Sequence, residues 1–234
     1  QILDDSTDET SHMVESAVRF WRTKKINISH LRRDHRTGFK AGALSFGMRQ
    51  SDAPFIAIFD ADFIPPRQFL LKALPYFELG DVGMVQARWG HLNARQSYLT
   101  RAQSVLLNCH FNIEHKVRNA LGWFFNFNGT AGIWRREAIH DAGGWSDDTV
   151  TEDLDLSIRA SMHGWRSRYI HELVVPASLP EQLSAWRTQQ DRWVCGGIQT
   201  AKKHLKLARK DSWQWFFSKD DRLAILLQNF SYFP

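Results

Sequence analysis

Short apolar runs alternate with amphipathic stretches along the first half of this 234-residue chain. The run at residues 55–59 is continuous and apolar, as is typical of a strand buried in a parallel sheet. It is followed by stretches with helical spacing of apolar residues, at residues 68–77 and 96–117. This alternation predicts an α/β fold with a mainly parallel sheet and right-handed crossovers.

The other expected elements follow the same order. We predict strands near residues 2–3, 26–31 and 82–87, and helices near residues 10–21 and 40–48. Beyond residue 124 the chain is richer in glycine and aromatic loops. Ligands of open α/β sheets bind beyond the carboxyl ends of the strands, so we expect two acidic pairs at that edge: Asp4 with Asp5, and Asp60 with Asp62.

Each acidic pair has two interpretations. Asp60 and Asp62 lie two apart after a strand, where their carboxylates could bind Mg²⁺ or Mn²⁺ with diphosphate oxygens completing the shell. Aspartates are also common in turns and helix caps, and such a structural role is the second interpretation of this pair. Asp4 or Asp5 could contact a nucleobase or ribose, or the segment Asp4-Asp5-Ser6-Thr7-Asp8 could cap the following helix.

Two later segments carry further candidates. Asp153 begins an expected helix and could act as a general base toward an acceptor hydroxyl, although carboxylates in a first turn also stabilise the helix dipole. Helical spacing places Gln189, Arg192 and Trp193 on one side, suited to a phosphate and a sugar ring, or to a surface salt-bridge helix. Lys40 could reach a phosphate or be an exposed helix lysine.

The charge balance favours an anionic partner. Lys and Arg number 30 against 25 acidic residues, which gives a net charge of +5. A nucleic-acid partner is disfavoured because paired aspartates repel phosphates unless a metal intervenes. The only cysteines, Cys109 and Cys195, predict no disulfide framework and favour a reducing compartment.

The C-terminal segment is basic and aromatic. Trp213, Trp215, Phe216 and Phe217 lie close to Lys and Arg, a pattern typical of an interfacial helix on an anionic membrane surface. We expect residues 206–234 to form such a helix at the cytoplasmic face and to lead into a transmembrane segment. The chain has the character of a piece of a longer protein.

Four motifs together carry a family resemblance: Asp4-Asp5, Asp60-x-Asp62, Thr151-Glu152-Asp153 and Gln189-x-x-Arg192-Trp193. In this order they resemble the signatures of the processive, membrane-embedded family 2 glycosyltransferases, such as the cellulose, hyaluronan, chitin and mannan synthases. The segments Gly38-Phe39-Lys40-Ala41-Gly42 and Phe127-Asn128-Gly129-Thr130 make the likeness greatest to β-mannan and glucomannan synthases and their bacterial relatives.

The resemblance implies a GT-A fold over residues 1–205, with the family's first strand expected before Gln1. It implies Mg²⁺ or Mn²⁺ at Asp60 and Asp62, and Asp153 as the catalytic base. Donor nucleotide and diphosphate contacts are implied for Asp4, Asp5, Lys40, Asp60, Gln189 and Arg192. Acceptor contacts are implied for Phe127, Asn128, Gly129, Thr130, Glu152 and Trp193.

The expected function is an inverting β-glycosyl transfer at the cytoplasmic face of a membrane. The donor is a nucleotide sugar, GDP-mannose or UDP-glucose, and the acceptor is a growing polysaccharide or a lipid. Membrane lipids are expected partners and nucleic acid is not. The alternative is a non-catalytic domain of the same fold that binds a nucleotide sugar.

Overall fold

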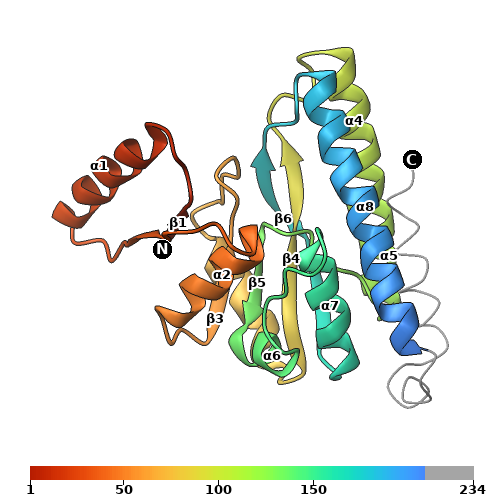
Figure 1. The fold of residues 1–234 in the computed structure, drawn as a ribbon. Coiled ribbons are helices and arrows are strands. Elements are labelled where there is room, and N and C mark those ends of the chain that lie inside the picture. Colours follow the sequence, from red (N-terminus) through yellow and green to blue (C-terminus); the bar gives the residue numbers. More distant parts are fainter. Residues whose placement is uncertain (209–234) are drawn as a thin grey trace. The chain divides into compact units, whose positions relative to one another are not determined.

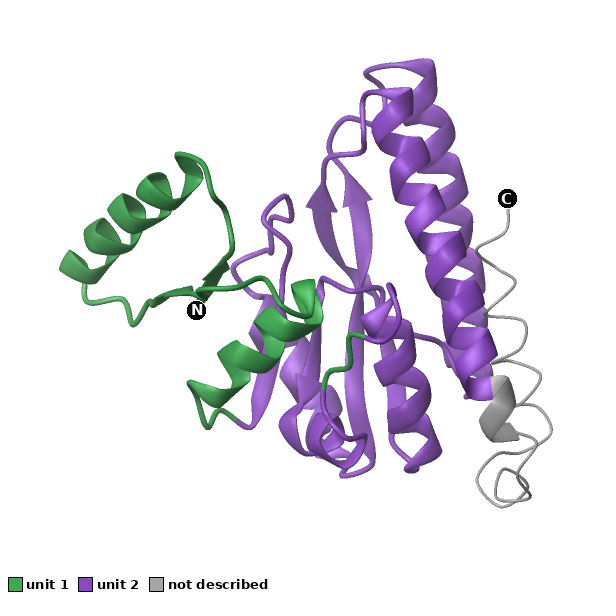
Figure 2. Cartoon of the chain, in the orientation of Figure 1, with its two compact units in different colours: residues 1–53, 145–147 green, residues 54–144, 148–234 purple. Residues whose placement is uncertain are grey.

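The computed structural model describes residues 1–208 of the chain and divides it into two compact units. Unit 1 consists of residues 1–53 and 145–147, and unit 2 contains residues 54–144 together with the chain from residue 148 onward (Figure 2). The expected interfacial helix and membrane lead-in at 206–234 fall almost entirely outside the described residues.

Unit 1 is a two-stranded parallel sheet with two helices. Its elements are β1 (Ile2–Asp4), α1 (Thr10–Thr23), β2 (His30–Arg32) and α2 (Phe39–Arg49). Both predicted helices are confirmed. The second strand begins four residues later than expected, because the chain turns at Lys25, which adopts a left-handed φ of 59°, before it extends. Among the apolar side chains of α1, Val18 is buried whereas Met13 and Trp21 are exposed.

Unit 2 is built on a four-stranded sheet with the order β3-β5-β4-β6. Its strands are β3 (Phe55–Ile58), β4 (Val82–His91), β5 (Gly132–Arg135) and β6 (Arg166–Ala177). β5 pairs antiparallel with both β3 and β4, whereas β4 pairs parallel with β6. The sheet is therefore mixed rather than mainly parallel, and β3 is a partly buried edge strand rather than a central one.

The helical elements of unit 2 cover this sheet (Figure 1). They are α3 (Phe69–Ala73), the 3₁₀ turn η1 (Leu74–Glu78), α4 (Tyr98–Cys109), the π-helical turn η2 (His110–His115), α5 (Lys116–Leu121), α6 (Arg136–Asp141), α7 (Glu152–Met162) and α8 (Leu183–Ala208). The helix predicted at 96–117 is thus interrupted by a π turn. The helix predicted at 68–77 changes to 3₁₀ geometry at Leu74, which precedes a proline.

The core of unit 2 is apolar and aromatic. One face of the sheet packs against α3 and η1 through Phe69, Phe77, Val85, Ile133 and Val175, all nearly or fully buried. The rings of Phe55 and Phe77 lie 4.7 Å apart between centroids. Burial of this kind contributes roughly 25 cal/mol per Å² of apolar surface and so stabilises the unit.

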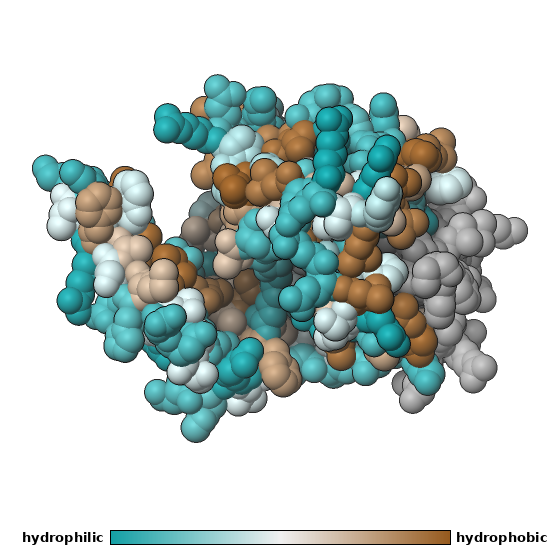
Figure 3. Space-filling view, turned by 90° about the horizontal axis from the view of Figure 1, so that it is seen from above, coloured by the Kyte–Doolittle hydropathy of each residue, from teal (hydrophilic) through white to brown (hydrophobic). Residues whose placement is uncertain are grey.

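The described surface mixes polar and apolar side chains (Figure 3). Large apolar side chains that are exposed include Met13, Leu71 and Tyr98. Within residues 1–208, none of the helices combines the length and the hydropathy that a bilayer-spanning segment requires.

Candidate functional site

The Asp60-x-Asp62 motif lies in a turn at the end of β3, beside the loop that leads into β5. The backbone N–H of Asp60 donates to the Thr130 hydroxyl at 2.8 Å, and the N–H of Phe63 donates to the Asp60 carbonyl at 3.0 Å. Asp60 is half-buried and Asp62 is exposed. The loop of residues 126–131, here called the site loop, is therefore held directly against the first acidic motif of unit 2.

A buried glutamine on β4 fixes the main chain of the site loop. The Gln86 side chain is fully buried, and its Oε1 accepts from the Asn128 N–H at 2.9 Å. Its Nε2 donates to the carbonyls of Thr130 at 3.1 Å and Ala131 at 3.2 Å. Ala131 adopts a left-handed φ of 57°, so these hydrogen bonds stabilise a backbone shape that a non-glycine residue seldom takes.

The other end of the site loop is joined to the first turn of α7. The Phe127 N–H donates to the Ser157 hydroxyl at 2.9 Å, and that hydroxyl donates to the Asp153 carbonyl at 2.6 Å. The Asp153 carboxylate accepts from the Leu154 N–H at 2.9 Å and is half-buried. Unit 2 thus connects Asp60, the site loop and Asp153 through a continuous set of hydrogen bonds.

Three of the four loop residues predicted to contact an acceptor are buried. The Phe127 ring is fully buried and packs edge-on against Trp134, with 5.9 Å between ring centroids. It belongs to the core, which corrects the prediction that this side chain lines an acceptor surface. Gly129 and Thr130 are buried as well, and Asn128 is half-buried.

Helix α8 packs closely on the residues that precede Asp153. A Cβ atom at Gly196 would lie 2.7 Å from the Thr151 hydroxyl, and the Thr200 and Thr151 hydroxyls are 3.1 Å apart. Gln189, Arg192 and Trp193 lie N-terminal to this contact on the same helix, with Arg192 exposed and the other two half-buried. The helix that carries the Gln-x-x-Arg-Trp motif is thereby anchored next to Thr151, Glu152 and Asp153.

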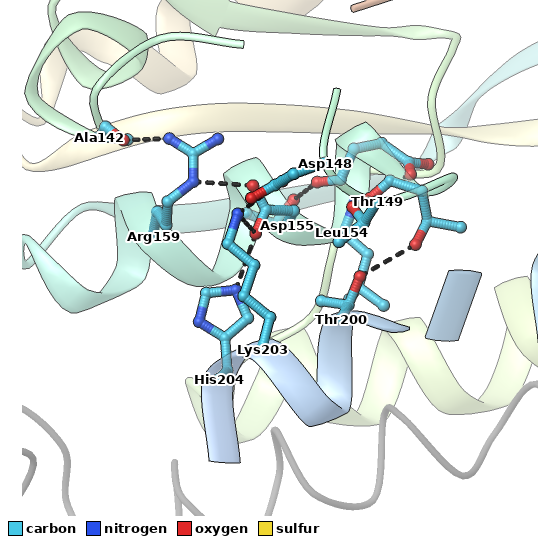
Figure 4. A network of polar contacts seen from close by, with 12 residues as sticks. Ala142, Asp148, Thr149, Leu154, Asp155, Arg159, Thr200, Lys203 and His204 are labelled. Carbon is cyan, nitrogen blue, oxygen red and sulfur yellow. Dashed lines mark hydrogen bonds and ion pairs between the residues drawn. The ribbon is translucent and has the colours of Figure 1, made fainter. Parts of the chain in front are cut away.

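A buried charge cluster reinforces the contact between α7 and α8 (Figure 4). Asp155 is fully buried and accepts from Arg159 Nε, Lys203 Nζ and His204 Nε2, each at 2.8 Å. Lys203 also contacts Asp148 at 2.8 Å. Burial alone would raise the pKa of Asp155, but His204, Lys203 and Arg159 outweigh it and hold that pKa well below its ordinary value.

In unit 1 the Asp4 carboxylate is buried and accepts hydrogen bonds from three residues. It accepts from the Ser6 N–H at 2.8 Å, the Ser6 hydroxyl, His30 Nε2 at 2.8 Å and Arg32 at 3.3 Å. Burial raises its pKa, but the Ser6, His30 and Arg32 contacts lower that pKa well below its usual range. The carboxylate therefore stays ionised and joins β1 to β2.

Asp5 holds the loop before α2 through one arginine. Both Asp5 oxygens accept from Arg33, which also donates to the carbonyls of Thr37 at 2.8 Å and Phe39 at 3.0 Å. Neither Asp4 nor Asp5 caps α1, because Asp8 accepts the N–H of Thr10 at the start of that helix, at 3.1 Å. Within residues 4–8 the helix contact is thus made by Asp8, and the nucleotide contact of Asp4 or Asp5 stays a prediction.

The segment that carries Lys40 is also built around this arginine. Gly38 adopts a left-handed φ of 72° and leads into α2, where Lys40 lies in the first turn and is half-buried. A Cβ atom at Gly42 would collide with the Thr37 carbonyl and lie 2.6 Å from Arg33 Nη1. Only glycine at position 42 lets the helix approach the Arg33 side chain this closely.

Replacing Gly42 by Ala should therefore destabilise unit 1 by about 1–3 kcal/mol, as expected for overpacking of a closed site. Hydrogen exchange of the α2 amides would report the loss as reduced protection. Gly80 is the matched control, since a Cβ atom there meets nothing within 4 Å. Equal protection of the α2 amides in Gly42→Ala and Gly80→Ala would show that Thr37 and Arg33 can move aside without loss of stability.

The metal prediction is consistent with the donor atoms of unit 2. Asp60 and Asp62 supply hard carboxylate oxygens from one turn, which suit Mg²⁺ or Mn²⁺. Among residues 1–208 there is no group of three or more His, Cys, Asp or Glu side chains placed to bind a metal. Two carboxylates fit a cation whose remaining ligands come from a bound diphosphate and water.

A sequence model of the glycosyl transferase family group 2 matches residues 55–233, more than half of the chain. The chain belongs to this glycosyltransferase family. Probable glucomannan 4-beta-mannosyltransferase 11 of Arabidopsis thaliana is 45% identical over 208 residues, which are 87% of this chain and 47% of that protein. Glucomannan 4-beta-mannosyltransferase 1 of Cyamopsis tetragonoloba is 44% identical over 88% of this chain and 40% of its own length.

The chain thus spans less than half of these curated relatives. Among solved structures, the mannosyltransferase PcManGT from Pyrobaculum calidifontis, in complex with GDP-Man and Mn2+, has a TM-score of 0.63 at 24% identity, over 84% of this chain and 52% of that one. TarS of S. aureus in complex with UDP-GlcNAc has a TM-score of 0.54 at 13% identity, over 83% of this chain and 54% of that one. These similarities confirm the GT-A fold of this family 2 glycosyltransferase.

Several residues that shape the site were not predicted. They are polar side chains within buried elements that hydrogen-bond to the site loop or between α7 and α8: Gln86, His115, Asp155 and Ser157. A polar residue inside an otherwise buried apolar segment is the signal that could have found them, since such groups are costly to bury unless they are paired.

Proposed function

We propose that the protein is an inverting β-glycosyltransferase that transfers a hexose from a nucleotide sugar to a growing polysaccharide or a lipid acceptor, at the cytoplasmic face of a membrane. GDP-mannose is the favoured donor and UDP-glucose the second. The observation that carries this proposal is the connection of Asp60, the site loop and Asp153 in unit 2. The identity to glucomannan mannosyltransferases supports mannose.

In this proposal Asp60 and Asp62 bind Mg²⁺ or Mn²⁺ together with the donor diphosphate. A cation held by these carboxylates would supply charge neutralisation for the leaving nucleoside diphosphate. Arg192, with Gln189, contacts the same diphosphate, while Asp4 or Asp5 contacts the nucleoside and Lys40 a phosphate. These are the roles that the sequence predicts.

Asp153 takes the proton from the attacking acceptor hydroxyl. Its place in the first turn of α7 favours the ionised carboxylate, because the N-terminal end of a helix stabilises negative charge. Attack from the side opposite the diphosphate inverts the anomeric centre without a protein nucleophile. Trp193, Glu152 and the half-buried Asn128 contact the acceptor sugar.

The full-length protein in membranes or nanodiscs would test this function. Radiolabelled GDP-mannose and UDP-glucose are offered separately with Mn²⁺ or Mg²⁺, and labelled polymer is counted. Incorporation from one donor would establish the transfer and its sugar. Donor binding without incorporation from either nucleotide sugar would favour the alternative, a non-catalytic nucleotide-sugar-binding domain.

Metal removal should abolish transfer, and added Mn²⁺ or Mg²⁺ should restore it. Asp62→Asn should raise the cation concentration needed for half-maximal activity by more than about tenfold, since even outer-shell partners of metal ligands are worth about 10–100-fold in affinity. A cation titration of the rate would measure this, with the exposed Asp52→Asn as control. Unchanged activity in excess chelator would remove the metal from the proposal.

A further inference from the structure

A second polar network reaches the site loop from the π-helical turn η2. His110 and His115 lie at the two ends of this turn, and their ring centroids are 4.2 Å apart. The Asn128 side chain bridges them: its Oδ1 lies 2.8 Å from His115 Nε2 and its Nδ2 lies 3.0 Å from His110 Nε2. Turns with π geometry are often found where a side chain must be aimed at a functional site.

The hydrogen-bond directions of this network follow from the Asn128 amide. Its Nδ2 can only donate, so His110 Nε2 accepts and His110 Nδ1 carries the proton, which it donates to Glu114 Oε2 at 2.8 Å. Its Oδ1 can only accept, so His115 Nε2 donates. His115 is fully buried, which lowers its pKa well below 6.5 and keeps it neutral.

Glu114, within η2 itself, completes the network together with Arg118 of α5. The second oxygen of Glu114 accepts from Arg118 Nε at 3.0 Å, and Arg118 donates further to the Phe124 carbonyl at 3.2 Å. Burial raises the pKa of Glu114, but His110 and Arg118 lower it more, so the carboxylate remains charged. A charged acceptor at this place holds the His110 proton on Nδ1 and leaves Nε2 free to accept from Asn128.

We propose that His110, oriented by Glu114, is a positioning residue that fixes the direction of the Asn128 amide and so aligns the acceptor sugar against Asp153. This inference rests on the proposed function. Two separate devices then act on the site loop. Gln86 fixes its main chain, whereas His110 and His115 fix the side chain of Asn128. Loss of His110 should therefore disturb the amide and leave the loop backbone in place.

The test compares His110→Phe with His110→Gln in the full-length protein. Phenylalanine keeps the ring but removes the acceptor, whereas a glutamine amide can again face Asn128. His110→Phe should lower kcat/KM for the acceptor by on the order of 10- to 100-fold, as small misplacements at a reacting centre do, with the donor KM unchanged. His110→Gln should recover most of the loss, and the exposed His140→Phe should equal wild type.

Asn128→Ala supplies the coupling measurement. If His110 acts through Asn128, the double variant His110→Phe/Asn128→Ala should be no worse than Asn128→Ala alone. Additive losses, an equal change in the donor KM, or identical rates in His110→Gln and His110→Phe would overturn the inference. Thermal melts of every variant separate these effects from general loss of folding.

Binding of a β-1,4-linked mannooligosaccharide, followed by calorimetry, gives a readout without turnover. His110→Phe should weaken this binding and His110→Gln should not. If the wild-type protein transfers sugar, and the His110 variants bind the oligosaccharide and react as well as the wild type, only the positioning role is overturned. A wild-type protein that neither transfers sugar nor binds the oligosaccharide would overturn the proposed function and this inference with it.

Discussion

Replacing Asp153 by Asn should lower kcat by about 10²–10⁴-fold, the usual contribution of a general base. The substitution keeps the size of the side chain and its capacity to accept the Leu154 N–H, so α7 should remain intact. It removes the ability to take a proton from the acceptor hydroxyl. Initial rates of polymer formation, with donor affinity measured in parallel, would detect the loss.

The control for Asp153→Asn is Asp81→Asn, which alters an exposed ion pair with Arg166 in the same unit. Exposed pairs contribute about 0–1 kcal/mol, so this variant should react at the wild-type rate. The general-base assignment would fail if Asp153→Asn kept its rate. It would also fail if donor affinity fell in proportion to the rate, because Asp153 would then be a donor-binding residue.

Asp155→Ala should destabilise unit 2 by about 3–5 kcal/mol, the typical cost of removing one partner from a buried ion pair. Asp155 is completely buried and balances Arg159 and Lys203, whose side chains are only 17% and 26% exposed. Without the carboxylate Arg159 loses its ion-pair partner on α7, and Lys203 keeps only the more exposed Asp148. Denaturant unfolding and hydrogen exchange of the α7 amides would measure the change.

The matched control is Asp148→Ala, because Asp148 is the other, more exposed partner of Lys203. Its loss should cost no more than about 1 kcal/mol. A similar small effect for Asp155→Ala would mean that the cluster is solvated and does not fix α7 against α8. A fall in activity without a fall in stability would instead place Asp155 in the reaction itself.

The same carboxylate gives the wild type a defined pH dependence. The folded-state pKa of Asp155 lies below its ordinary value of 3.8, so its stabilisation is complete above about pH 4 and is lost as the pH falls toward the folded-state pKa. Asp4 contributes in the same direction in unit 1. The stability difference between wild type and Asp155→Ala should therefore shrink in acid.

Local sequence patterns determined several helices and strands of this protein and the positions of its acidic motifs on them. The helices α1, α2 and α7 and the strands β3 and β4 follow from the spacing of apolar residues, because that spacing reports which face of an element is buried. The placement of Asp60 and Asp62 after β3, and of Glu152 and Asp153 in the first turn of α7, follows from the same patterns. The family signature is likewise a property of residue order alone.

Contacts between distant segments decided the rest. The four-residue strand β5 lies between β3 and β4 and pairs antiparallel with both. A segment this short has too little periodicity to predict that pairing. Three polar contacts join residues that are 18 to 49 positions apart in the sequence. They are the pairs Asp5–Arg33, Asp155–His204 and His110–Asn128. The partners of these residues, and hence their roles, exist only once the chain has folded, because ion pairs and buried hydrogen bonds depend on distance in space and not on order in the sequence.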